Sequence, residues 1–166
     1  MRRLVGFTVL AIALAVPAIA FAVGASDDGT LSVKAGVGRV ALAPFNGSAL
    51  GRVAHGRIVV VDPIFGDAGS YDLWGCDNNT KTDVLEHATV CSGSNLRFRV
   101  VDGKYKLFIR GSGINLSAVG RGLVSLDGRG DDSDVTDDGV YALNDGAYRS
   151  LPDSEKTLPL VAPAAG

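Results

Sequence analysis

Apolar and polar residues alternate in short runs along the chain, and glycine, asparagine or aspartate stands between most of the runs. Alternation with a period of two is typical of a strand that buries one face. The run Ile58–Val61 is apolar throughout, which indicates a central strand covered on both faces. The further strands are expected within 31–35, 40–42, 50–53, 114–118, 124–126, 140–143 and 147–151.

Eight to ten short strands at this spacing predict an all-β fold, an antiparallel β-sandwich or small barrel with Gly-rich turns. A β-solenoid is the alternative, because short strands that end in glycine also occur there. The segment around Gly111–Gly122 echoes the earlier stretch Gly36–Val40, but the echo is too irregular to establish a repeat. The sandwich or barrel is therefore the preferred prediction.

The clearest local signal is a hairpin over Leu96–Arg110, with Asp102-Gly103 as a two-residue type I′ turn. In that register Val101 faces Lys104, and one face of the hairpin is entirely apolar. Its members are Leu96, Phe98, Val100, Tyr105, Leu107 and Ile109.

The opposite face of this hairpin collects positive charge. Like charges facing one another are unfavourable, so the face needs a negative partner. An aspartate-rich loop downstream is the preferred partner, and an anionic envelope polymer is the alternative, with Phe108 as a flat surface for a sugar. The cations are Arg97, Arg99, Lys104, Lys106 and Arg110.

The amino terminus predicts export. Met1-Arg2-Arg3 precedes an apolar run and small-x-small cleavage sites before Val23 and Ser26, as in a signal peptide. The predicted organisation is a signal peptide over 1–25, a single all-β domain over 26–152 and an extended C-terminal tail over 153–166. An uncleaved signal anchor is the alternative. Loss of Arg2 and Arg3 from the 16 basic residues leaves 14 against 18 acidic ones, so no nucleic-acid partner is expected, and no membrane contact after cleavage.

Two cysteines, Cys76 and Cys91, are expected to form a disulfide outside the cell. Too few further ligands accompany them for a zinc site. The segment Ile64–Asn95 is less periodic than the rest and is interpreted as an elaborated loop that this bond holds in place, with one or two helical turns over Thr82–Ala88.

The sequence carries no recognised catalytic motif, and no catalytic residue or cofactor is assigned. The favoured function is a non-enzymatic, secreted or cell-envelope β domain that is structural or binds an anionic polymer. A carboxylate-dependent hydrolase such as a glycosidase is the alternative. One acidic loop is best explained as a solvated, charged loop, and a Ca²⁺ site is the weaker explanation. Its residues are Asp131, Asp132, Asp134, Asp137 and Asp138.

The stretch that runs from the predicted hairpin into the next glycine-rich turns resembles an uncharacterised family of secreted bacterial β-rich proteins. The resemblance covers Leu96–Gly128 well and Gly29–Asp62 loosely. It implies export and an all-β fold, and it implies no activity and no functional residues.

Overall fold

The protein is described from a computed structural model, over residues 27–63, 69–77, 81–83, 87–129 and 138–163. These residues contain strands and no helix, and every strand pairing is antiparallel. The elements are β1 (Gly29–Val61), β2 (Ser70–Cys76), β3 (Lys81–Asp83), β4 (Ala88–Val101), β5 (Lys104–Gly128), β6 (Val140–Leu143), β7 (Arg149–Ser150) and β8 (Lys156–Leu160).

The central feature is one long two-stranded ribbon. β1 pairs with β4 from Val61↔Ala88 to Ala49↔Val100, and it continues with β5 as far as Gly29↔Gly120. The chain 88–120 therefore runs along the whole of β1 in nearly constant register. The segment between Val61 and Ala88 joins the two arms of the ribbon.

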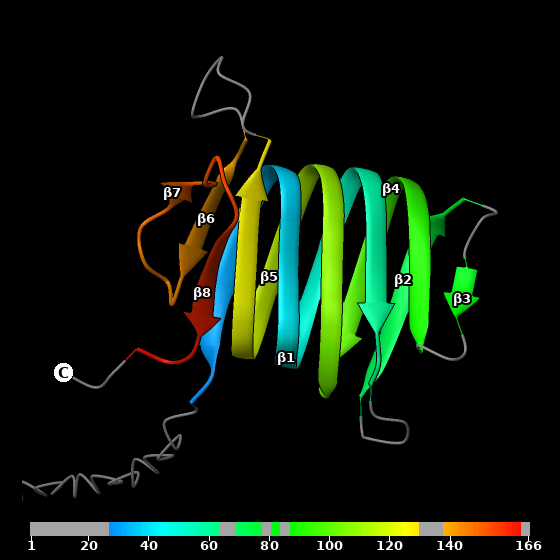
Figure 1. Ribbon diagram of the computed structural model, residues 1–166, viewed down its shortest axis with the longest axis horizontal. Helices are drawn as coiled ribbons and strands as arrows, with labels where there is room; N and C mark the ends of the chain where they lie inside the picture. The colour runs from blue at the N-terminus through cyan, green and yellow to red at the C-terminus, as the bar shows by residue number, and fades with distance from the viewer. Residues whose placement is uncertain (1–26, 64–68, 78–80, 84–86, 130–137, 164–166) are drawn as a thin grey trace, which may run out of the picture.

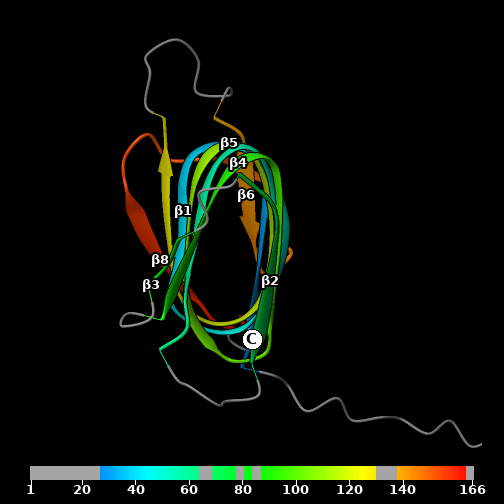
Figure 2. The same cartoon turned by 90° about the vertical axis from the view of Figure 1, so that its right-hand side faces the viewer.

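This ribbon winds on itself. β1 and β5 pair in a second register, from Val61↔Lys106 to Gly38↔Gly128. Ile109 consequently lies between Val40 and Ile58, which are one turn of the coil apart along the chain. The coil is flattened, so that the sheet forms two layers that face each other (Figures 1 and 2).

The two layers can be followed from the strands at their ends. Layer A contains 38–47, 56–61, 103–111, 120–128 and β8, and layer B contains 29–38, 47–56, 93–101, 111–120, β2 and β6. Figure 2 shows β8 on one side of the coil and β2 and β6 on the other. The predicted all-β, antiparallel, sandwich-like architecture is confirmed, and the path of paired strands has two open ends rather than closing into a barrel.

A repeat of nine residues underlies the coil, which corrects the prediction that the glycine pattern is too irregular for a repeat. Gly29, Gly38, Gly47 and Gly56 are nine residues apart, and each begins one half-turn. The residues two positions later also recur every nine residues and are buried: Leu31, Val40, Ala49 and Ile58. A half-turn thus holds a bend and a short strand whose alternate residues enter the core.

The hairpin at Asp102-Gly103 is a wrong prediction. β4 and β5 do not pair with each other, because β1 is the partner of both. Asp102 and Gly103 have φ angles of 44° and 139° and bend the ribbon from one layer into the other. The Gly47 amide donates to the Gly103 carbonyl over 3.1 Å across this bend.

The predicted alternation of this region is nevertheless correct, because a bend and a hairpin turn both leave the period of two intact. All six residues of the predicted apolar face are 2 % exposed or less. They line the space between the two layers, together with Val60 and Val124 from neighbouring turns.

Shorter strands complete the two ends of the coil. The predicted Cys76–Cys91 disulfide is present and joins β2 to β4, and the segment expected to be a loop includes β2 and β3. At the other end β6 pairs with β1 and β8 pairs with β5. The predicted C-terminal tail therefore includes a strand of the sheet, and its Leu160 is fully buried.

Candidate functional site

The first candidate site is a row of side chains across the outer face of layer B. Trp74 of β2 lies opposite Arg97 of β4, and Arg97 lies opposite Arg52 of β1. Arg52 in turn lies opposite Asn115 of β5. Directly opposed residues of antiparallel strands project from the same face, so these four form one continuous line, which we call the basic row.

The basic row crosses an open groove of about 1290 Å³. Trp74 and Leu50 line this groove and are 49 % and 61 % exposed. The groove also contains four cationic side chains and no carboxylate among the described residues that line it. The cations are Lys34, Arg52, Arg97 and Arg99.

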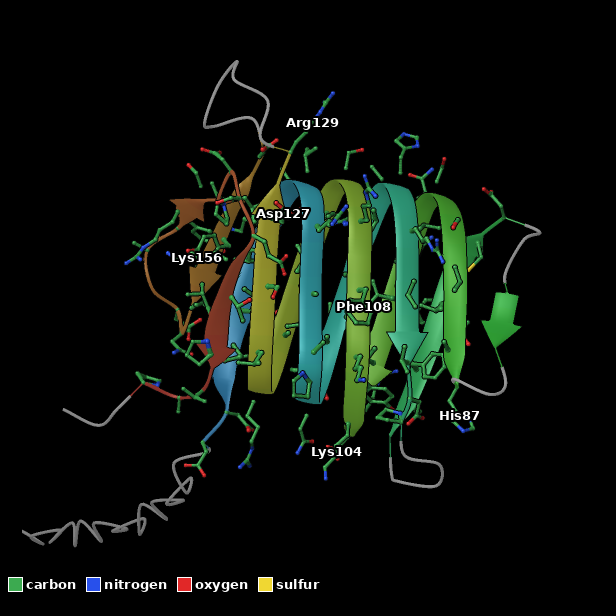
Figure 3. The ribbon with its side chains drawn as sticks, in the orientation of Figure 1. His87, Lys104, Phe108, Asp127, Arg129 and Lys156 are labelled. Carbon is green, nitrogen blue, oxygen red and sulfur yellow. A yellow bond between two sulfur atoms is a disulfide. The ribbon has the colours of Figure 1, made fainter. Side chains whose placement is uncertain are left out.

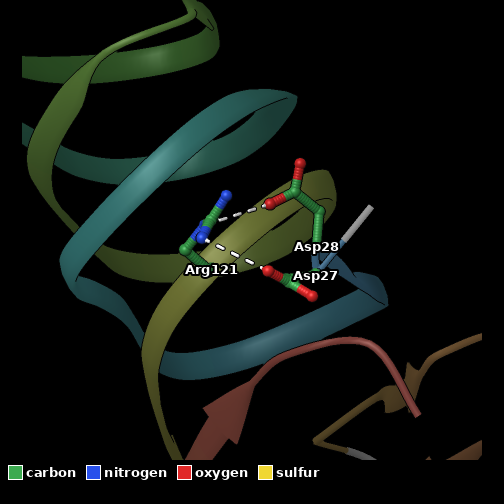
Figure 4. Close-up of polar contacts among 3 residues, drawn as sticks. All are labelled: Asp27, Asp28 and Arg121. Atoms are coloured by element: carbon green, nitrogen blue, oxygen red, sulfur yellow. Dashed lines mark ion pairs between the residues drawn. The ribbon is translucent and has the colours of Figure 1, made fainter. Parts of the chain in front are cut away.

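Asp72 of β2 lies directly opposite Arg99, but the two side chains form no ion pair. In the described part of the chain, no carboxylate lies within 4.0 Å of the guanidinium of Arg52, Arg97 or Arg99. Arg121 provides the contrast, since it pairs with Asp27 at 3.8 Å and with Asp28 at 3.4 Å (Figure 4). Arg52 opposite Arg97 costs on the order of 0.2–1 kcal/mol by the cross-strand rule.

Lys34 has a neutral partner. Its Nζ lies 4.1 Å from the centre of the Tyr148 ring, and the Tyr148 hydroxyl shares a 3.0 Å hydrogen bond with Ser32. A hydrogen bond with Lys34, followed by the one with Ser32, lowers the pKa of Tyr148 below its usual value of 10.0. The aromatic ring and the ammonium group therefore stabilise each other at this exposed edge of the groove.

The structure divides the predicted five-cation face between the two layers, which corrects the prediction of a single face. Arg97 and Arg99 belong to layer B, whereas Lys104, Lys106, Phe108 and Arg110 lie beyond the bend at Asp102-Gly103. Phe108 projects from layer A in Figure 3. The prediction failed because it required β4 and β5 to be neighbours, whereas β1 separates them.

Sequence reasoning missed the partners that β1 and β2 contribute, namely Arg52, Trp74, Arg39 and Arg57. A signal for two of them was present. The dipeptides Gly38-Arg39 and Gly56-Arg57 are separated by two nine-residue units, which is one full turn of the coil. Residues one turn apart lie in the same layer, so the repeat would have placed both arginines together.

The acidic loop lies mostly outside the described residues, including Asp131, Asp132, Asp134 and Asp137. Asp138 is described, and it is buried, with its carboxylate accepting a 2.6 Å hydrogen bond from the Arg129 amide. No cluster of three possible metal-ligating side chains occurs in the ranges that the structure describes.

A serine and a histidine approach each other at a bend of the coil. His55 Nδ1 lies 2.9 Å from Ser94 Oγ, and both residues are exposed. Within the described ranges, no carboxylate forms a hydrogen bond to this imidazole that would orient it as a general base. Among the residues that the structure describes, the pair therefore has no third member of a catalytic triad.

In comparisons with known proteins, no family model, no curated protein and no solved structure matches this chain. None of the described residues forms a helix that is long and apolar enough to cross a membrane. The disulfide indicates an oxidising environment.

Proposed function

We propose that the protein is an exported, non-enzymatic binding module for an acidic polysaccharide, which lies in the layer B groove. The observation that carries this proposal is the lining of the groove, with four cations, no carboxylate among its described residues, and an exposed tryptophan at one end. An unneutralised row of arginines is unfavourable in the isolated protein, and an anionic ligand removes that cost.

The chemistry of the row favours a sugar polymer. The flat face of Trp74 suits the apolar face of a pyranose ring, and the guanidinium groups of Arg52 and Arg97 suit carboxylates or sulfates in bidentate geometry. The row crosses several adjacent strands, and neighbouring strands lie ~4.8 Å apart, so consecutive sugars can contact consecutive strands.

The test is retention of the folded protein on immobilised polygalacturonate. The double variant Arg52→Gln/Arg97→Gln should weaken binding about tenfold or more and flatten its dependence on salt, because two charged contacts are lost. Arg149→Gln is the control, since it removes one exposed cation from β7, outside both the groove and the layer A pocket. The control should bind like the wild type.

Two results would contradict the proposal. The wild-type protein should be retained at low salt on columns of polygalacturonate, sulfated pectin or heparin. If it flows through all three columns, an acidic-polysaccharide ligand is excluded. A purely structural role for the basic row predicts that Arg52→Gln/Arg97→Gln lowers the melting temperature and leaves retention unchanged. The binding proposal predicts the reverse for both measurements. Loss of the two like charges relieves their repulsion, so the melting temperature should be unchanged or slightly higher, and retention should fall.

A carboxylate-dependent hydrolase is the second candidate, and one observation favours it. Asp127 and Glu155 line a smaller pocket on layer A together with Phe108. Two carboxylates are the minimum that glycoside hydrolysis requires. Release of reducing ends from acidic polysaccharides by the wild type, and its loss in Asp127→Asn and Glu155→Gln, would favour hydrolysis over simple binding.

Export is part of the proposal and has its own test. The predicted signal peptide implies that the mature chain begins at Val23 or Ser26. Amino-terminal sequencing of protein recovered from the medium or the envelope checks this position. Recovery of a chain that still begins with Met1 would favour the uncleaved anchor.

A further inference from the structure

Layer A carries a second cationic row that the coil assembles from three strands. Arg110 of β5 lies opposite Arg39 on one side and opposite Arg57 on the other. All three arginines are exposed. Each lies at a position where β1 and β5 turn the same face outward, so the three guanidinium groups project together from the outer surface of layer A.

This row borders a pocket of about 490 Å³. Phe108, which is 40 % exposed, forms an aromatic part of its wall, and Asp127 and Glu155 contribute carboxylates. Asp127 is the strand neighbour of Arg39, yet no carboxylate of the described residues lies within 4.0 Å of the guanidinium of Arg39, Arg57 or Arg110. The site therefore combines an aromatic surface with three cations and two carboxylates, whereas the layer B groove combines its aromatic surface with four cations and no lining carboxylate.

The two cationic sites face away from each other. Arg52 and Arg97 project outward from layer B, and Arg39, Arg57 and Arg110 project outward from layer A. Packed sheets lie ~10 Å apart, and the side chains on both outer faces add to that separation. A short oligosaccharide bound to one face cannot reach the other.

We propose that the layer A row binds a second segment of acidic polysaccharide, so that one molecule of the protein holds two polymer segments on opposite faces and cross-links them. This inference rests on the proposed function, because it assigns the same ligand chemistry to both faces. Two modest sites on one rigid coil would give strong retention on a polymer through multivalency.

Calorimetric titration with a short oligogalacturonate measures the number of sites directly. The wild type should bind two oligosaccharides per chain. The layer A variant Arg39→Gln/Arg57→Gln/Arg110→Gln and the layer B variant Arg52→Gln/Arg97→Gln should each bind one. Arg149→Gln, which removes an exposed cation from β7, should still bind two.

Light scattering with full-length polygalacturonate measures cross-linking. The wild type and Arg149→Gln should form large assemblies that dissolve when the protein is in excess, since each polymer segment then has its own protein molecule. Both face variants should bind the polymer without forming them. If the triple variant is unfolded by circular dichroism, Arg57→Gln alone should weaken the second binding step and raise the protein concentration needed for assembly.

The outcomes separate this inference from the proposed function. One oligosaccharide per wild-type chain, lost in the layer B variant and unchanged in the layer A variant, would overturn bivalency and leave the groove as the binding site. A single site that either variant abolishes would show one polymer segment wrapped around the coil, which also overturns cross-linking. No binding by the wild type would overturn both proposals.

Discussion

Replacement of Gly38 by alanine should destabilise the fold strongly, because this residue occupies a bend with strands on both sides. Gly38 has a φ angle of 125° and pairs with Gly111 in one register and with Gly128 in the other. A Cβ atom at this position would collide with the Asp127 carbonyl oxygen and would lie 2.8 Å from the Gly128 carbonyl carbon. These neighbours are backbone atoms, which cannot move away without opening the sheet.

The expected cost has two parts. Alanine in this backbone conformation is strained by about 1–2 kcal/mol. Separation of the neighbouring strand weakens about one or two hydrogen bonds, at ~1 kcal/mol each. The free energy of unfolding should therefore fall by about 3 kcal/mol, which corresponds to a decrease of ~9 °C in melting temperature for a domain of this size.

The matched control is Gly36→Ala, two residues earlier in the same strand. Gly36 is buried and does not have a positive φ angle. A Cβ atom there would meet side-chain atoms, with Val33 Cγ1 at 3.0 Å and Leu151 Cδ1 at 3.2 Å, and these can shift slightly. Gly36→Ala should cost about 1 kcal/mol, at the low end of the range for overpacked cores, because the neighbouring side chains can shift.

Thermal and urea unfolding, followed by far-ultraviolet circular dichroism, would measure both variants. Equal melting temperatures for Gly38→Ala and Gly36→Ala would refute the reasoning, since they would show that the bends tolerate a side chain. The double variant Gly38→Ala/Gly111→Ala adds a second check. Its cost should be smaller than the sum of the single costs, because the first substitution already separates the two strands.

Three further outcomes are expected. The double variant Cys76→Ser/Cys91→Ser should lose about 2–4 kcal/mol of stability, measured by urea unfolding without reductant, and an unchanged midpoint would mean that the bond constrains little. The phenolate absorbance of Tyr148 should appear at a lower pH in the wild type than in the Lys34→Gln variant. The lowered pKa of Tyr148 adds stability only at alkaline pH, where the tyrosine of the unfolded chain would also ionise. Titration curves that overlap in the two proteins would contradict the hydrogen bond with Lys34. Trp74 is the only tryptophan, so its fluorescence should change when polygalacturonate is added, and a spectrum that stays constant at saturation would place the polymer elsewhere.

The sequence by itself determined the strands and their buried faces. Alternation is a local property, because successive residues of a strand point to opposite sides whatever the strand pairs with. The six alternate apolar residues from Leu96 to Ile109 are therefore assigned correctly to the core, although the predicted pairing between them is wrong. The nine-residue spacing of Gly29, Gly38, Gly47 and Gly56 was also present in the sequence and contained the period of the coil.

Only the tertiary structure decided which strands are neighbours. Asp102-Gly103 needs positive φ angles both in a hairpin turn and in a bend of a continuing ribbon, so the local signal cannot distinguish the two. Pairing of 88–120 with the whole of β1 carries Arg97 and Arg110 to opposite layers. The basic row and the layer A row therefore exist only because contacts between residues far apart in the sequence outweigh the local turn.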